Sequence, residues 1–244
     1  MSRMGLFGSM SSVTSAAHIM KPVSISLTHI VQLPRQDGGD AHPALILLHG
    51  RGTDEHDLLG LAPYLDPRLL IVSTRAPFPF AYGGGYAWYD VLQVGIPHPG
   101  MFAESYDRLA TFVDEAVAGY PIDPQRVFLL GFSMGAVMAH ALALTQPRRL
   151  AGVVAHSGYV PPEKELDLEF ALGELAGRGW FVAHGVNDPV IPVEFGRATR
   201  DLLQSTAADL TYSEYPIAHQ ISQRSLDDLS AWLTVRIGST DSHR

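Results

Sequence analysis

The stretch GFSMG at residues 131–135 decides the fold of this chain. It follows a short apolar run at 127–130 that is typical of a buried strand, and it opens into an Ala- and Leu-rich run at 136–144 that is typical of a buried helix. A Gly-x-Ser-x-Gly motif between a strand and a helix is the nucleophile elbow, a turn so tight that its glycines prevent collisions of Cβ atoms. We therefore predict that Ser133 lies at the tip of this turn with its hydroxyl exposed. An ordinary glycine-rich turn with a surface serine is the alternative, which the surrounding strand and helix disfavour.

Apolar strand-like runs alternate with helical patterns on both sides of this motif. Such alternation predicts an α/β fold, with a mostly parallel central sheet and helices on both of its faces. The run at 24–31 alternates in polarity and is interpreted as an antiparallel edge strand, and Thr53 is a candidate helix N-cap. We expect strands at 44–48, 69–73, 127–130, 150–155, 180–183 and 210–215, and helices at 54–65, 101–118, 192–203 and 221–233.

Length and composition favour one globular domain. The chain has 244 residues, of which 46% are hydrophobic, enough for a single sizeable core. We expect residues 1–20 to form a disordered leader, since their apolar residues are interrupted, and residues 21–240 to form the domain. The net charge of −8, without a basic cluster, argues against a nucleic-acid partner. The absence of cysteine is typical of a cytoplasmic protein, and no apolar run reaches the ~18 residues of a transmembrane helix.

Chemically useful residues follow several of the expected strands. The sequence HGRG at 49–52, Ser133, the pair Asn187-Asp188 and His219 each come directly after one of them. Parallel α/β sheets carry their functional loops at the carboxyl ends of the strands, so we expect these residues to gather at one edge.

A serine nucleophile needs a histidine base, which in this kind of fold follows it in the chain. His219 lies between the last strand and the last helix, where it can reach across the end of the sheet, and it is the predicted base. A loop histidine or a helix cap is the alternative reading of His219. The other histidines after the motif fit less well by position: His140, His156, His184 and His243.

The acid of a triad must hold its histidine in one orientation. Asp188 stands in the sequence GVNDPVIP, where glycine, asparagine and two prolines predict a fixed turn after a strand. The other acidic candidates are better interpreted as solvated surface residues: Asp167, Glu169, Asp201 and Asp209. An oxyanion hole needs backbone N–H donors, which we assign to Met134 at the start of the helix and to Arg51 in the glycine-rich loop. The Arg51 side chain either binds an acidic substrate group or faces solvent.

Together these segments resemble the small carboxylesterase/phospholipase family of the α/β-hydrolases, which includes the acyl-protein thioesterases. The resemblance covers roughly residues 23–235 and implies a serine esterase with Ser133, Asp188 and His219 as its triad. It also implies the amides of Arg51 and Met134 as the oxyanion hole. The thioesterases have glutamine directly after the nucleophile, where this chain has Met134. The family commonly has glycine directly before the catalytic histidine, where this chain has Ala218. Both differences point to a bacterial-type carboxylesterase. The matching pieces are LLHGRG at 47–52, Ala76-Pro77, YAWYD at 86–90, GFSMG at 131–135, His184-Gly185, DPVIP at 188–192 and His219.

The segment at 77–89 is rich in aromatics, glycine and proline, and it is interpreted as the wall of an apolar substrate pocket. A satellite core cluster is the alternative. The loop at 91–101 is a candidate second wall. The charged stretch at 159–175 is expected to be a solvated face, with a small cap as the alternative. No insertion is long enough for a large lid domain, so we expect an open site for small soluble esters. The candidate pocket residues are Phe78, Phe80, Tyr82, Trp88, Tyr89 and Ile191.

The sequence therefore predicts a serine carboxylesterase for small to medium acyl esters, with thioesters or lysophospholipids as further substrates. The alternatives are a non-catalytic ligand-binding member of the fold and an acyl transferase or lyase on the same fold. We expect no cofactor and no metal, because the eleven histidines show no ligand spacing; His49 and His56 are too far apart. The oligomeric state stays open, with a homodimer among its alternatives.

Overall fold

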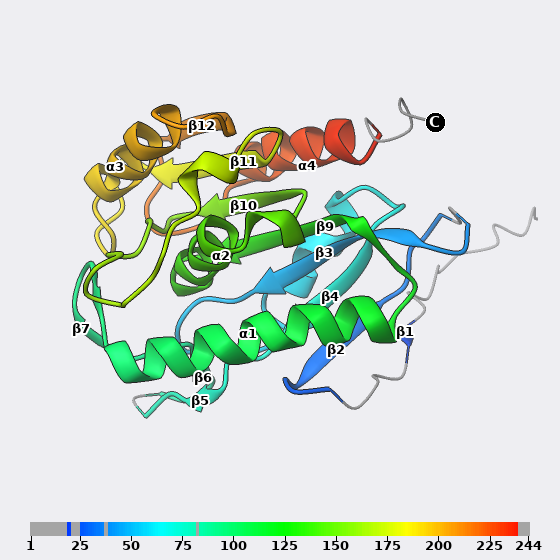
Figure 1. The fold of residues 1–244 in the computed structure, drawn as a ribbon, viewed down its shortest axis with the longest axis horizontal. Coiled ribbons are helices and arrows are strands. Elements are labelled where there is room, and N and C mark those ends of the chain that lie inside the picture. Colours follow the sequence, from blue (N-terminus) through cyan, green and yellow to red (C-terminus); the bar gives the residue numbers. More distant parts are fainter. Residues whose placement is uncertain (1–18, 21–24, 37–38, 82, 239–244) are drawn as a thin grey trace, which may run out of the picture.

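The core of the protein is an eight-stranded sheet with the order β1-β2-β4-β3-β9-β10-β11-β12 (Figure 1). The computed structural model describes all residues except 1–18, 21–24, 37–38, 82 and 239–244. The strands of this sheet are β1 (Ile19–Met20), β2 (His29–Gln32), β3 (His42–Leu48), β4 (Leu70–Thr74), β9 (Ile122–Phe132), β10 (Gly152–His156), β11 (Gly179–Gly185) and β12 (Asp209–Tyr215).

Strand direction follows the predicted pattern. Six strands of this sheet run parallel to one another: β4, β3, β9, β10, β11 and β12. In contrast, β2 is antiparallel to both β1 and β4. The expected strand at 24–31 is therefore antiparallel, but it spans His29–Gln32 and has β1 outside it. The outer strand β1 consists of Ile19 and Met20, the last residues of the expected leader. They pair with Gln32 and Val31 of β2. Residues 1–18 of the expected leader lie outside the described residues.

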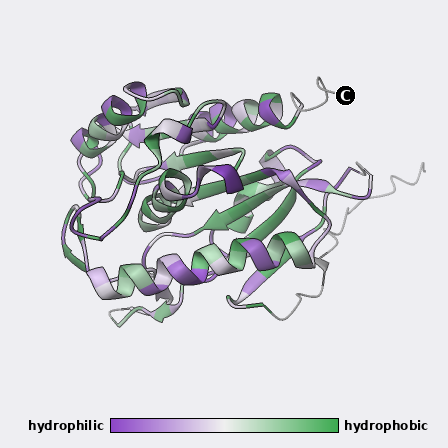
Figure 2. Cartoon of the chain, viewed as in Figure 1, coloured by the Kyte–Doolittle hydropathy of each residue, from purple (hydrophilic) through white to green (hydrophobic). Residues whose placement is uncertain are grey.

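Helices cover both faces of the sheet, as the alternation predicted. Along β3, Ala44, Ile46 and Leu48 enter one hydrophobic cluster, and Leu45 and Leu47 enter the other, because successive side chains of a strand point to opposite faces. Figure 2 shows the hydrophobic strands at the centre of the molecule. The first cluster is covered by α1 (Pro99–Gly119), α2 (Met134–Thr145) and α3 (Val193–Gln204), and the second by the 3₁₀ helix η1 (Leu58–Tyr64) and α4 (Gln223–Gly238).

The helix expected at 54–65 is wrong in type and length. Only Leu58–Tyr64 is helical, as a 3₁₀ helix that contains Pro63 and has no side-chain cap. Proline removes a backbone donor, which favours a short helix here. The predicted cap, Thr53, instead pairs with Tyr86 in an isolated β-bridge, and its Oγ1 donates to the carbonyl of Gly50 at 3.0 Å. The Thr53 side chain therefore makes its hydrogen bond inside the loop that follows β3 and not at the start of a helix.

Short irregular pieces surround the carboxyl end of the sheet. Two hairpins, one made of β5 (Phe78–Pro79) and β6 (Tyr86–Ala87) and one of β7 (Val91–Gln93) and β8 (Ile96–Pro97), replace the loops expected there.

The charged stretch after Tyr159 holds exposed Glu163, Lys164 and Glu165, as expected of a solvated face. Two 3₁₀ turns, η2 (Pro147–Arg149) and η3 (Leu172–Glu174), complete the elements. No helix within the described ranges is long and apolar enough to span a membrane.

The turn from β9 into α2 is as tight as the GFSMG motif predicted. A Cβ atom on Gly135 would lie 2.0 Å from the carbonyl oxygen of Leu48, and one on Gly131 would lie 2.4 Å from the backbone of Gly135. Ser133, between them, adopts φ 54° and ψ −119°, a conformation that non-glycine residues rarely take. The packing of helix against strands therefore holds the serine in its strained position.

We predict that Gly135→Ala destabilises the fold by about 3 kcal/mol or more, because the added methyl meets backbone atoms that no side-chain rotation can move aside. Urea unfolding at neutral pH measures the change. Gly173→Ala is the matched control, since a Cβ at Gly173 meets nothing within 4 Å. Equal stability of the two variants would contradict the close approach of α2 to β3.

Candidate active site

A chain of two hydrogen bonds joins three residues at the carboxyl edge of the sheet. Ser133 Oγ lies 2.8 Å from His219 Nε2, and His219 Nδ1 lies 2.6 Å from Asp188 Oδ2. Because the carboxylate only accepts, Nδ1 carries the imidazole proton and Nε2 accepts the hydroxyl proton of Ser133. The structure thus brings together the three residues that the sequence singled out, in the order in which the predicted nucleophile, base and orienting acid must touch one another.

Asp188 is held by backbone groups of its own turn. Its Oδ1 accepts the N–H groups of Val190 at 2.8 Å and Ile191 at 2.9 Å, which leaves Oδ2 for His219. Burial raises the pKa of Asp188, but the hydrogen bonds from Ile191, His219 and Val190 outweigh it, and the net pKa lies below its ordinary value. The carboxylate is therefore both ionised and fixed in direction, as an orienting acid requires.

The other histidines near the sheet have different surroundings. Burial lowers the pKa of His140 to about 3, and within the described chain neither of its ring nitrogens has a hydrogen-bond partner. His156 contacts the hydroxyls of Ser157 and Ser225, and burial lowers its pKa to about 3. His184 Nε2 donates to the carbonyl of Ile191 at 2.8 Å. Among these histidines only His219 touches the serine, in agreement with its predicted place.

His49, which sequence reasoning left without a role, fastens the loop that carries Arg51. Its Nε2 accepts the N–H of Ala76 at 3.0 Å, so its Nδ1 is the protonated nitrogen and donates to the carbonyl of Gly50 at 2.6 Å. The indole of Trp88 donates to the His49 carbonyl at 3.0 Å. A buried histidine with both nitrogens engaged thus ties the loop to two neighbouring segments.

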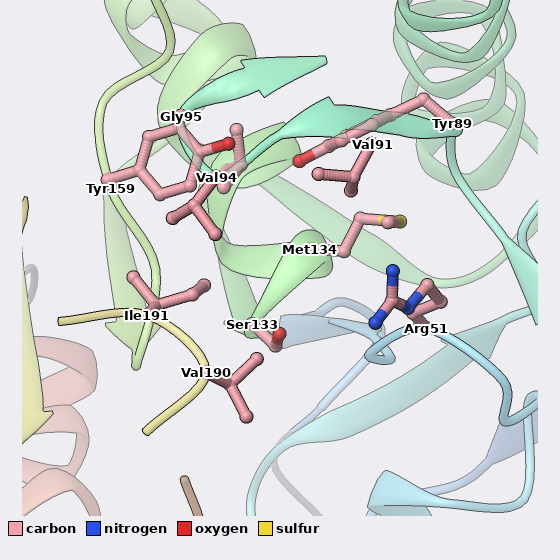
Figure 3. A pocket seen from close by; sticks show the side chains of 11 residues that line it. Arg51, Tyr89, Val91, Val94, Gly95, Ser133, Met134, Tyr159, Val190 and Ile191 are labelled. Atoms are coloured by element: carbon pink, nitrogen blue, oxygen red, sulfur yellow. The ribbon is translucent and has the colours of Figure 1, made fainter. Parts of the chain in front are cut away.

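A cavity of about 100 Å³ opens beside Ser133 (Figure 3). Of the predicted pocket residues, Tyr89 and Ile191 line it, whereas Phe78, Phe80 and Trp88 do not. Trp88 is fully buried, which fits the alternative of a core cluster. Tyr82 lies outside the described residues. The lining consists of Arg51, Tyr89, Val91, Val94, Gly95, Ser133, Met134, Val137, Tyr159, Val190 and Ile191.

The hairpin β7–β8 supplies the wall that the sequence placed in the loop at 91–101. Val91, Val94 and Gly95 belong to it, and Val91 and Val94 are also exposed at the mouth of the cavity. The wall residue Tyr159 hydrogen-bonds Tyr89, and burial raises the pKa of both phenols, so they stay neutral. Tyr159 carried no sequence signal, because it follows β10 in a stretch without a motif.

The described part of the chain contains no group of three or more His, Cys, Asp or Glu side chains placed to hold a metal ion. The polar groups that line the cavity are instead the Ser133 hydroxyl, two phenols and the Arg51 guanidinium, with His219 behind Ser133. Such a set can transfer a proton and stabilise a developing negative charge.

Comparison with known proteins agrees with this geometry. The family model described as "Phospholipase/Carboxylesterase" matches residues 32–237. The chain belongs to this family. Its members hydrolyse carboxylic esters with a serine nucleophile, so the predicted class of enzyme and the predicted α/β-hydrolase fold are both confirmed.

Similar proteins within the family cover most of the chain. Acyl-protein thioesterase 1 of Candida albicans is 28% identical over 79% of this chain and 91% of that protein. Lysophospholipase-like protein 1 of Mus musculus is 27% identical over 86% of this chain and 95% of that protein. The crystal structure of the Bacillus cereus carboxylesterase matches with a TM-score of 0.76 and 27% identity, over 86% of this chain and 94% of that one.

Proposed function

We propose that this protein is a serine carboxylesterase that hydrolyses esters of small to medium acyl groups through Ser133, His219 and Asp188. The observation that carries the proposal is the pair of hydrogen bonds from Ser133 to His219 and from His219 to Asp188, at 2.8 and 2.6 Å. Family membership supports the class of reaction, and the cavity beside Ser133 supports the position of the substrate.

The first half of the reaction forms an acyl-enzyme. Ser133 Oγ attacks the ester carbonyl carbon while its proton moves to His219 Nε2. Asp188 stabilises the imidazolium that results, and its fixed direction keeps the ring in place. The oxygen of the carbonyl becomes negative and accepts the backbone N–H groups that we assign to Arg51 and Met134. When the intermediate collapses, the bond to the alcohol oxygen breaks and Nε2 gives that oxygen its proton.

The second half releases the acid. His219 Nε2 takes a proton from a water molecule, whose oxygen attacks the acyl-enzyme carbonyl. The same N–H groups hold the oxyanion, and Ser133 leaves with the proton from His219. The N–H of Met134 is suited to this work because it lies in the first turn of α2, where N–H groups have no acceptor within the helix and the helix dipole favours negative charge.

The cavity favours short acyl groups. Its volume of about 100 Å³ is well below the ~300–1,000 Å³ of pockets that enclose drug-sized ligands. Its walls are mainly aliphatic, with Val91, Val94, Val137 and Ile191 among them. Thioesters and lysophospholipids with accessible carbonyls remain within the same chemistry, because the attack on the carbonyl is unchanged.

We predict that Ser133→Ala lowers kcat for a soluble short-chain ester by about 10⁴-fold or more. Asp188→Asn is expected to lower it by about 10³–10⁴-fold, because the amide can donate to Nδ1 and so leaves the proton on Nε2, which then cannot accept from Ser133. Hydrolysis of p-nitrophenyl butyrate under initial-rate conditions measures both changes.

Asp167→Asn is the matched control for the loss of one carboxylate, since Asp167 is exposed and belongs to the solvated stretch after β10. Its kcat/KM should equal that of the unaltered protein. Turnover by the Ser133→Ala protein within a few-fold of normal would remove Ser133 from the mechanism. Formation of a new ester when alcohols are added would show an acyl transferase instead.

We predict that p-nitrophenyl acetate and butyrate are hydrolysed with higher kcat/KM than octanoate or palmitate. Ile191→Ala, which widens the cavity, should raise the relative kcat/KM of longer esters by about fourfold for each methylene that enters, since burying one contributes ~0.8 kcal/mol. Val235→Ala, at an exposed position of α4, is the control and should leave the profile unchanged. A preference for palmitate in the unaltered protein would contradict the assignment of this cavity to the acyl group.

A further inference from the structure

Arg51 places a positive charge at the cavity beside the nucleophile. Its side chain lines the same cavity as Ser133 and Met134, and Figure 3 draws its guanidinium on the side away from Val190 and Ile191. The guanidinium carbon lies 5.5 Å from the centre of the Phe80 ring, a cation–π contact that leaves the N–H groups of the fork available.

Arg51 has no carboxylate partner within the described ranges, unlike most arginines of the chain. Arg68, Arg75 and Arg197, for example, pair with Asp66, Glu55 and Glu214. The acidic residues that follow Arg51 in its own loop contact other groups. Asp54 Oδ1 accepts the N–H of His56 at 2.9 Å, Glu55 pairs with Arg75, and Asp57 Oδ2 lies 3.2 Å from the Thr53 hydroxyl.

Arg51 is itself exposed, so its guanidinium lies at the open side of this apolar cavity. Its planar fork matches a carboxylate with two parallel hydrogen bonds, which selects for the shape of the anion as well as its charge. The remaining wall is aliphatic or phenolic and offers an anion no other charge. The net charge of −8 repels anions at long range, so a preference for anionic substrates would have to come from a local contact.

We propose that the Arg51 side chain binds a carboxylate group of the substrate, so that the enzyme prefers esters that carry a carboxylate close to the scissile carbonyl. This inference rests on the proposed esterase function. The carboxylate belongs either to the acyl part, as in half-esters of dicarboxylic acids, or to the alcohol part, as in esters of hydroxy acids.

Two matched pairs of substrates distinguish these sources. Mono-p-nitrophenyl glutarate is compared with p-nitrophenyl pentanoate for the acyl side, and acetylated para-hydroxybenzoate with acetylated para-hydroxybenzamide for the alcohol side. In one pair, the ratio of kcat/KM between the anionic and the neutral ester should exceed one. Arg51→Gln should lower that ratio by about tenfold, the usual effect of losing a hydrogen bond to a charged group.

The ratio cancels any effect of the substitution on the oxyanion hole, because both esters of a pair use the same backbone N–H groups. Arg148→Gln is the control, since it removes an equal charge from an exposed arginine that pairs with Glu174 outside the cavity. It should leave the ratio unchanged. A ratio that falls equally in both variants would overturn the inference, because the effect would then belong to the net charge.

Calorimetric titration of glutarate and of para-hydroxybenzoate gives a readout that needs no hydrolysis. The unaltered protein should bind at least one of them about tenfold more tightly than Arg51→Gln does. If neutral esters are hydrolysed but neither the ratio nor the binding depends on Arg51, the inference is wrong and the esterase function stands. If no ester is hydrolysed but binding depends on Arg51, the anion site stands and the esterase function is wrong.

Discussion

The close packing of α2 on β3 and β9 is the constraint on which the rest of the site depends. Only glycines fit at Gly131 and Gly135, since Cβ atoms there would lie 2.4 and 2.0 Å from backbone atoms. The turn between them forces Ser133 to φ 54°. The expectation of an exposed hydroxyl is wrong, because Ser133 is buried and its Oγ lies against His219. The same turn places the first N–H groups of α2 beside Ser133, where the proposed mechanism needs donors for the oxyanion. One steric requirement thus positions both the proposed nucleophile and part of its proposed electrostatic support.

The loops after β11 and β12 bring Asp188 and His219, the proposed acid and base, together because these loops too are packed against each other. The two strands run in parallel register up to Gly185, which pairs with Tyr215. A Cβ on Gly185 would lie 2.4 Å from the carbonyl oxygens of Ile217 and Ala218, so the loop carrying His219 lies directly on the strand that leads to Asp188. Phe132 supports the imidazole from the side of the elbow, with ring centres 4.9 Å apart. The base is therefore held by contacts on both sides.

Much of the site could be predicted because its signals are local. A few consecutive residues are enough to predict the geometry of the elbow and of the turn around Asp188. The parallel topology then predicts that residues at the carboxyl ends of the strands lie close together. The pocket was less predictable, because an aromatic such as Trp88 serves equally well in a wall or in the core, and only its complete burial away from the cavity lining decides. The expected helix at 54–65 is shorter because Pro63 interrupts it and because Thr53 finds its partners at Gly50 and in β6 instead of at a helix N-terminus. Hydrophobic periodicity does not reveal such contacts.

Covalent labelling with a fluorophosphonate, followed by mass spectrometry of the digested protein, reports whether Ser133 is an activated nucleophile. A serine activated as described should react stoichiometrically at Ser133, and the Asp188→Asn protein should react far more slowly because its imidazole presents the wrong tautomer. Modification of a different serine, or no modification of the folded protein, would contradict the account.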